Sequence, residues 1–248
     1  MTFRTNVRGI FIAGTGTGVG KTLITAGVLR RLQAHAPEAI VMKPMQTGAE
    51  PVPGQGLAAP DVDFVLRAAD LTVDPETLSH ISPYIFATAC SPHLAARLAG
   101  RPIDIDVILS SARWLAGRYR SLVVEGAGGL CVPLDDKGHT MLDLISALDL
   151  PVILVGHAGL GAINHALLSL TALHQNGCRV LGVVLNDTVP IEAEQAYIHD
   201  DNALVIARLG RAQVLRVPYL GPQQERASNM AQLDALLDGT HFLKEALQ

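Results

Sequence analysis

The sequence has few cysteines and no long apolar run. Its three cysteines, Cys90, Cys131 and Cys178, are far apart and form no Cys-x-x-Cys pair, a pattern that excludes a disulfide framework and a cysteine zinc site. Although 49% of the 248 residues are hydrophobic, no apolar run reaches the ~18–20 residues of a membrane span. We therefore expect no membrane partner and a cytoplasmic location.

Basic clusters are also missing. The net charge is −4 and lysines and arginines do not gather in any segment, which argues against a nucleic-acid partner. The chain contains no internal repeat, low-complexity tract or interdomain linker. We therefore predict a single domain over residues 1–248.

Short apolar segments alternate with helical patterns along most of the chain. The predicted strands are Gly9–Ala13, Ala39–Met42, Ser121–Glu125, Pro151–Val155, Val180–Leu185 and Gln213–Val217. The predicted helices are Lys21–His35, Ile105–Gly117, Met141–Leu148, Ala162–Gln175, Glu192–Leu209 and one or two within Ala227–Leu247. Because the strands are continuously apolar, they indicate an α/β fold with a mostly parallel, twisted sheet and helices on both faces. The Pro- and Gly-rich segment Glu50–Pro60 is predicted to be a mobile loop.

A glycine-rich segment, Gly14–Thr22, lies between the first strand and the first helix. Strand, glycine-rich loop and helix are the context of a phosphate-binding loop, in which Lys21 reaches the β- and γ-phosphates and Thr22 ligates Mg²⁺. The loop is longer than the usual one, because five residues separate Gly14 from Gly20. The pattern predicts a P-loop NTPase-like fold that binds a nucleoside triphosphate.

Polar residues follow the next strands at the edge where ligands bind in such sheets. Lys43 comes directly after the second strand and Glu125 ends the third. A carboxylate in that position suits Mg²⁺ beside a triphosphate. Asp61 and Asp63 open a predicted helix, and either is a helix cap or a second metal ligand; their spacing does not choose between the two.

Residues suited to ligand binding also follow the fourth and fifth predicted strands. Glycines at 156, 159 and 161 precede a helix and create a site suited to a carboxylate, whereas His157 and His165 fit packing roles better than catalysis. Asn186 follows the fifth strand, and its amide offers a donor and an acceptor that match the edge of an adenine.

Taken in order, these segments resemble one enzyme family. The segments that carry the resemblance are Gly14–Thr22, Lys43–Gly48, Ser82–Tyr84, Ser91–His93, Val124–Gly129, Pro151–Val155, Leu160–His165 and Asn186–Asp187. Together they resemble ATP-dependent dethiobiotin synthetase, over residues 9–220, and the long phosphate loop is also this family's pattern. The resemblance implies a ligase of biotin biosynthesis that closes a cyclic urea on 7,8-diaminononanoate with CO₂, ATP and Mg²⁺.

The resemblance also implies roles for individual residues. Lys43 and Lys21 would be catalytic, and Thr22, Asp61 and Glu125 would hold Mg²⁺, with Asp61 matching the family better than Asp63. ATP would contact Gly18, Val19, Gly20, Lys21, Thr22, Leu23, Asp61, Glu125, Gly126, Ala127, Gly128, Asn186, Asp187, Pro218, Tyr219 and Leu220. The substrate would contact Thr47 and, from a partner subunit, Leu160, Gly161, Asn164 and Tyr197. The resemblance therefore also implies a homodimer with active sites at its interface.

Two other functions fit parts of the pattern less well. A carboxylate-amidating synthase usually carries a glutamine-hydrolysing domain, and few residues follow position 220. A nucleotide-gated dimeric ATPase of the ParA and MinD class typically has a second lysine early in the phosphate loop, where this chain has Thr15, Gly16 and Thr17. Many dethiobiotin synthetases carry acidic residues at positions 16 and 18, whereas both are glycine here.

Overall fold

A six-stranded sheet forms the centre of the computed structural model, which describes residues 7–54, 56–221 and 226–240. The strands follow the order β10-β9-β8-β1-β7-β2, and every neighbouring pair is parallel. They are β1 (Gly9–Gly14), β2 (Ala39–Met42), β7 (Ser121–Glu125), β8 (Val152–His157), β9 (Val180–Asn186) and β10 (Val214–Val217). The predicted parallel α/β sheet is confirmed.

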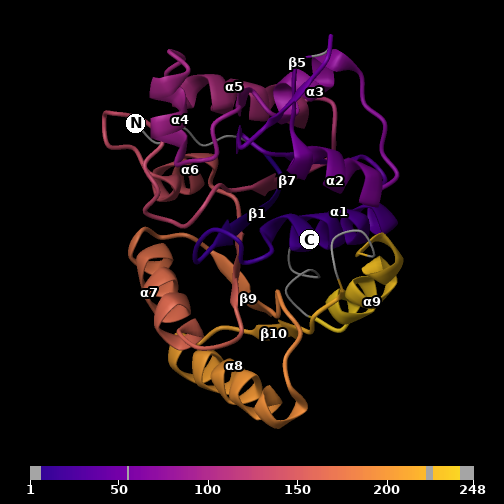
Figure 1. The fold of residues 1–248 in the computed structure, drawn as a ribbon, viewed down its shortest axis with the longest axis vertical. Helices are drawn as coiled ribbons and strands as arrows, with labels where there is room; N and C mark the ends of the chain where they lie inside the picture. Colours follow the sequence, from indigo (N-terminus) through magenta and orange to yellow (C-terminus); the bar gives the residue numbers. More distant parts are fainter. Residues whose placement is uncertain (1–6, 55, 222–225, 241–248) are drawn as a thin grey trace.

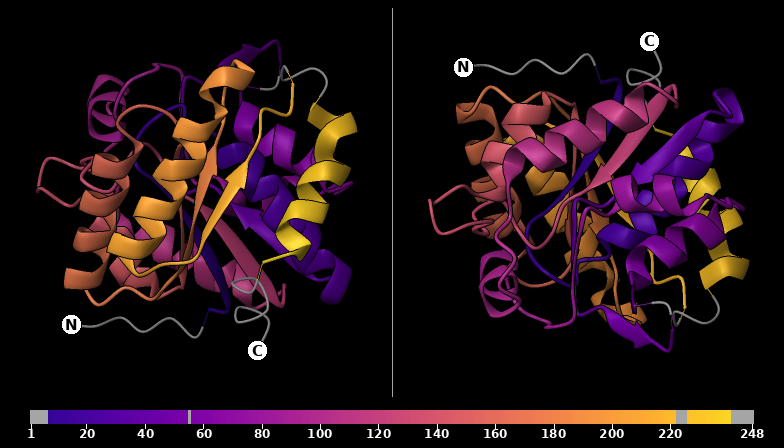
Figure 2. Two further views of the ribbon diagram at one scale, coloured as in Figure 1. Left: turned by 90° about the horizontal axis from the view of Figure 1, so that it is seen from below. Right: turned by 90° about the horizontal axis from the view of Figure 1, so that it is seen from above.

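Helices cover both faces of this sheet (Figure 1). The longer ones are α1 (Lys21–His35), α5 (Ile105–Ala116), α6 (Met141–Leu148), α7 (Ala162–Gln175), α8 (Ala196–Gly210) and α9 (Arg226–Asp238). In Figure 2, α1 and α9 lie on one side of the sheet and α7 lies on the other. A short 3-10 helix, η1 (Ala193–Gln195), precedes α8, so the predicted helix over 192–209 is two elements. The end of the predicted C-terminal helical segment lies outside the described residues.

The sheet is buried because its strands are apolar on both sides. Ile10, Phe11 and Ile12 of β1 are all 0% exposed, and residues that alternate sides along one strand can only be buried together when helices cover both faces. All six strands also end at one edge of the sheet, so the residues that follow them gather there.

Several short elements lie between β2 and α5 in the chain. They are β3 (Met45–Thr47), β4 (Glu50–Val52), β5 (Gly56–Ala58), α2 (Pro60–Ala68), α3 (Pro75–Ile81), β6 (Tyr84–Phe86) and α4 (Pro92–Leu98). The prediction of a loop over 50–60 was wrong in part, since β4 and β5 form an antiparallel hairpin there. Gly54 and Gly56 have φ angles of 73° and 88°, which let the chain reverse at little steric cost.

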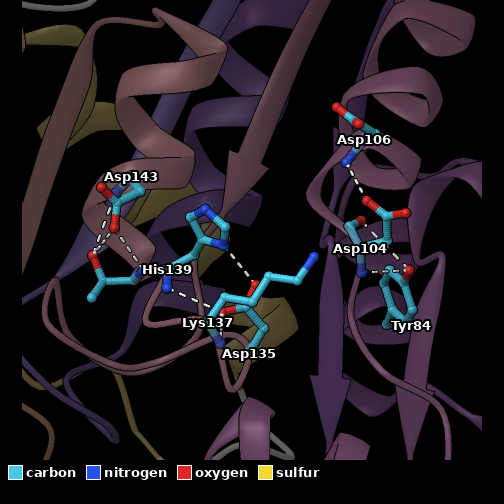
Figure 3. Close-up of polar contacts among 8 residues, drawn as sticks. Tyr84, Asp104, Asp106, Asp135, Lys137, His139 and Asp143 are labelled. Carbon is cyan, nitrogen blue, oxygen red and sulfur yellow. Dashed lines mark hydrogen bonds and ion pairs between the residues drawn. The ribbon is translucent and has the colours of Figure 1, made fainter.

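The connection between β7 and α6 is fixed by its own side chains (Figure 3). Asp135 accepts hydrogen bonds from the His139 backbone N–H at 3.0 Å and from the His139 ring at 2.6 Å. Thr140 and Asp143 then form a capping box that starts α6. These contacts hold the segment that carries Val132, a residue of the cavity described below.

None of the helices in the described ranges combines the length and the apolar character that a membrane crossing requires.

Candidate active site

A cavity of about 800 Å³ opens where β1, β2 and β7 end. Its walls come from the glycine-rich loop, from the start of α1, from β3 and α2, and from the segments after β6 and β7. Its lining residues are Thr17, Gly18, Gly20, Lys21, Thr22, Leu23, Lys43, Met45, Gln46, Thr47, Asp61, Phe64, Ala89, Cys90, Ser91, Pro92, Glu125, Gly126, Ala127, Gly128, Val132 and Thr188. The predicted phosphate, metal and diamine residues therefore share one cavity.

The glycine-rich loop leaves the first N–H groups of α1 uncapped. Gly20 occupies the N-cap position with φ 94°, and no side chain caps the helix. Uncapped N–H groups at a helix N-terminus attract anions. Gly14 passes so close to the neighbouring loop that a Cβ there would lie 2.8 Å from the Gly128 carbonyl oxygen. The local structure is therefore that of a phosphate cradle built from backbone.

Lys21 spans this cradle. Its Nζ donates to the Gly16 carbonyl at 2.8 Å and to the Gly128 carbonyl at 3.0 Å. Burial lowers the pKa of Lys21 to about 8, against the opposing influence of Glu125. Among the residues that the structure describes, no carboxylate pairs with this buried ammonium, so it is well placed to pair with phosphate oxygens.

Lys43, Asp61 and Glu125 form a buried ion cluster, called here the phosphate-side cluster. Lys43 Nζ contacts Asp61 Oδ2, and it donates to Glu125 Oε1 at 2.7 Å. The Thr22 hydroxyl donates to the same Glu125 oxygen at 2.8 Å. The end of β2, the start of α2, the end of β7 and the start of α1 thus meet at one point.

The charges in this cluster support one another. Burial disfavours the Lys43 ammonium, but Glu125 and Asp61 outweigh burial and raise the pKa of Lys43 above its ordinary value. Burial also disfavours the Asp61 carboxylate, but Lys43 outweighs it and holds the pKa of Asp61 below its ordinary value. Lys43 and Asp61 are therefore both charged at neutral pH.

The cluster fits a magnesium ion. Glu125 Oε2 is buried and has no hydrogen-bond partner among the described residues, so one carboxylate oxygen is free for a further ligand. Thr22 and Asp61 add a hydroxyl and a second carboxylate. No group of three or more His, Cys, Asp or Glu residues in the described ranges forms a metal cage, but Mg²⁺ is commonly held by one or two carboxylates, waters and substrate phosphates. Asp63 does not line the cavity.

The predicted base site lies at the end of β9. Asn186 is 3% exposed, and its Nδ2 donates to the Val19 carbonyl at 3.1 Å. Pro218–Leu220 follow Val217, the residue that pairs with Asn186 in the sheet. Asp187, by contrast, has both carboxylate oxygens bonded to side chains of this chain, so the geometry does not favour direct contact with a nucleotide.

The residues predicted to receive the substrate from a partner subunit do not line this cavity. Leu160, Gly161 and Asn164 border a separate hollow of about 500 Å³ on α7 and α8. Leu160 is fully exposed and Tyr197 is 70% exposed. Within one chain, these four residues are thus separate from the phosphate-side cluster.

Comparisons with known proteins show the family of the chain. A family model described as an AAA domain matches residues 8–225. ATP-dependent dethiobiotin synthetase BioD of Anaeromyxobacter sp. (strain K) is 41% identical over 92% of this chain and 97% of its own length. The enzyme of the same name from Clostridium novyi (strain NT) is 34% identical over 95% of this chain and 96% of its own. The chain belongs to the ATP-dependent dethiobiotin synthetase family. It is accordingly a ligase of biotin biosynthesis that uses ATP and forms dethiobiotin.

Solved structures with the same fold are more distant. McdA of Cyanothece is 12% identical, with a TM-score of 0.57 over 98% of this chain and 97% of its own. The MinD cell division protein of Aquifex aeolicus is 14% identical, with a TM-score of 0.51 over 97% of this chain and 94% of its own. These likenesses show the P-loop fold alone, so they do not favour a MinD-like function over dethiobiotin synthesis.

The structure adds cavity residues that sequence reasoning did not single out. Gln46 and Met45 come from β3, Phe64 from α2, and Ala89 and Cys90 from the segment before α4. Met45 and Gln46 lie inside the motif Lys43–Gly48, and Ala89 and Cys90 directly precede the motif Ser91–His93, so these two motifs were the available signal.

Proposed function

We propose that the chain closes the urea ring of dethiobiotin on 7,8-diaminononanoate, with CO₂ and ATP as co-substrates. One amine adds to CO₂ and loses a proton, which gives a carbamate. A carbamate oxygen attacks the γ-phosphorus and ADP leaves, which gives a carbamic–phosphoric anhydride. The second amine attacks the carbonyl carbon and expels phosphate. Such chemistry depends mainly on positioning and charge neutralisation.

The observation that carries this proposal is the position of Lys43. Lys43 is 6% exposed, and its ammonium lies between Asp61 and Glu125, in the same cavity as Lys21. Lys21 would neutralise the β- and γ-phosphates, and Lys43 would neutralise the carbamate and the transferring phosphoryl group. The residue at the diamine would be Thr47, which borders the cavity beside them.

Thr22, Asp61 and Glu125 would hold Mg²⁺. When bound, this ion supplies positive charge to the β- and γ-phosphate oxygens. The backbone of Gly18–Leu23 and Gly126–Gly128 would cradle the phosphates, and Asn186 with Pro218–Leu220 would hold the base.

The functional unit would be a homodimer. Leu160, Gly161, Asn164 and Tyr197 would bind the carboxylate of the substrate whose amines lie in the partner's cavity. Leu160 and Tyr197 are exposed, and none of the four lines the cavity of its own chain. A single domain over residues 1–248 and a cytoplasmic location remain predictions of the sequence.

The proposal is tested by mixing purified protein with MgATP, bicarbonate and 7,8-diaminononanoate and by identifying the product by mass spectrometry. Dethiobiotin should form in proportion to the ADP released. ATP hydrolysis that is independent of the diamine, without dethiobiotin, would overturn the proposal and favour a MinD-like ATPase.

A further inference from the structure

A second buried ion cluster lies next to the predicted base site, and it is called here the base-side cluster. It consists of Asp187, His199 and Arg216. Asp187 Oδ1 lies 2.6 Å from His199 Nδ1, and Oδ2 accepts from Arg216 Nη2 at 2.8 Å and from Nε at 3.2 Å. Since a carboxylate only accepts hydrogen bonds, His199 is the donor. The Asp187 side chain is 1% exposed, so both of its oxygens are satisfied inside the protein.

This cluster ties the backbone at Asp187, at the end of β9, to α8 and β10. His199 belongs to α8, Arg216 belongs to β10, and Asp187 directly follows β9. The Asp187 backbone N–H also donates to the Val217 carbonyl at 2.9 Å. A residue that is bonded through its carboxylate and its backbone holds the preceding residue, Asn186, in a defined orientation.

The orientation of Asn186 matters because only half of its amide is in use. Nδ2 donates to the Val19 carbonyl at 3.1 Å, whereas Oδ1 is buried without a hydrogen-bond partner among the residues described. Nδ2 keeps a second N–H, but its bond to Val19 fixes which end of the amide is nitrogen and which is oxygen, and Oδ1 is the acceptor left for a base. An acceptor matches the 6-amino group of adenine and opposes the 6-oxo group of hypoxanthine or guanine.

We propose that Asp187, His199 and Arg216 are positioning residues that keep the Asn186 amide oriented to accept a hydrogen bond from a 6-aminopurine. The inference rests on the proposed role of Asn186 in reading the base. Asp187 was predicted to contact ATP directly, whereas here it acts on the base through Asn186. Without the cluster, the end of β9 would lose its fixed orientation, and the amide could turn its donor toward a 6-oxo group.

The test compares ATP with inosine triphosphate, whose base carries a 6-oxo group. Arg216→Met removes both bonds to Asp187, together with the ion pair between Arg216 Nη1 and the exposed Asp200 at 2.7 Å, and keeps an apolar stem. It should lower the ratio of kcat/KM for ATP over inosine triphosphate about tenfold, through KM for ATP, with kcat at saturating ATP changed less than twofold. Arg216→Lys, which keeps one charged donor, should recover part of the ratio. Arg208→Met, at an exposed position on the same α8, is the matched control and should leave the ratio unchanged.

Two further variants keep the test decisive. His199→Ala removes the other partner of Asp187 and replaces Arg216→Met if that variant does not fold. Asn186→Ala should abolish the discrimination. The affinities for MgADP and for Mg-inosine diphosphate (IDP), measured by calorimetry, compare the 6-amino with the 6-oxo base without turnover.

The outcomes separate the proposals. Loss of discrimination in Asn186→Ala but not in Arg216→Met or His199→Ala would overturn the positioning role and leave base reading intact. Unchanged discrimination in all three variants would overturn base reading by Asn186 and the positioning role with it. A wild-type protein that makes no dethiobiotin would overturn the proposed function, while the ADP and IDP comparison would still decide the role of the cluster.

Discussion

The two buried ion clusters differ in how fully their oxygen atoms are satisfied. In the base-side cluster, both oxygens of Asp187 are bonded to protein donors. In the phosphate-side cluster, Glu125 Oε2 is buried without a partner in the described ranges, and two carboxylates face one lysine. Since an unsatisfied buried oxygen is costly, its presence marks a place that a ligand completes. The satisfied cluster instead stabilises and orients.

The two clusters should therefore respond differently to substitution. Removal of one partner from a complete cluster leaves a charge without compensation, which destabilises the fold. Removal of one partner from an incomplete cluster interferes with ligand binding and chemistry more than with folding. Each of the following variants tests this division.

Lys43→Gln should give the largest effect. It should lower kcat for dethiobiotin formation about a thousandfold or more, because charge on the transferring phosphoryl group is then left without a buried cation. Binding of MgADP, measured by calorimetry, should change little, since Lys21 remains in the phosphate cradle. Lys137→Gln, at an exposed lysine, is the control. A kcat within tenfold of the wild type would show that Lys43 has no catalytic role.

Asp187→Asn should give the largest loss of stability. Without the carboxylate, Arg216 and His199 face an amide that cannot accept from both, and we expect the free energy of unfolding to fall by about 3 kcal/mol. Glu125→Gln should cost about 1 kcal/mol or less, because Lys43 keeps Asp61 as its counter-ion. Urea unfolding without nucleotide measures both values. Equal losses of stability would contradict the view that the base-side cluster stabilises the fold more than the phosphate-side cluster does.

Much of the site followed from strand order alone. Lys43 and Glu125 were each predicted to lie at the ligand-binding edge, because parallel strands bring their ends to one edge whatever the loops between them; their direct contact came from the structure. The structure also places Asp61 against Lys43, although the β4–β5 hairpin separates the two in sequence.

The base-side cluster could not be predicted in the same way. Asp187 pairs with residues 12 and 29 positions away, and such pairing depends on how α8 and β10 pack rather than on any local pattern. The same holds for β3 and β6, whose three residues each are too short for a periodic signal. Gln46 of β3 belongs to the quoted segment Lys43–Gly48, but its position in the cavity was not predicted.

Asp61→Asn should weaken Mg²⁺ binding, whereas Asp63→Asn should not. Asp61 contacts Lys43 and lines the cavity, and Asp63 does not line it. Loss of one carboxylate ligand should raise the Mg²⁺ concentration for half-maximal activity about thirtyfold. A titration of Mg²⁺ against ADP binding and turnover measures the change. Similar shifts in both variants would point to general electrostatics rather than to coordination by Asp61.

Gly20→Ala tests the contact between the phosphate loop and Asn186 of the base site. Gly20 has φ 94°, and a Cβ there would lie 2.2 Å from Asn186 Nδ2, so the new methyl group would displace the amide that the base-side cluster orients. We expect the free energy of unfolding to fall by about 2 kcal/mol, together with weaker ATP binding and poorer discrimination against inosine triphosphate. Gly18→Ala is the matched control, since Gly18 also has a positive φ, 76°, but no atom lies within 4 Å of its added Cβ.

The difference between the two glycine variants isolates the contact from backbone strain. If both lose the same stability and neither changes discrimination, the phosphate loop and the base site act independently. If only Gly20→Ala loses discrimination, the close packing of Gly20 against Asn186 links the two halves of the nucleotide site. The absence of a side chain at position 20 is then a requirement of base selection as well as of loop geometry.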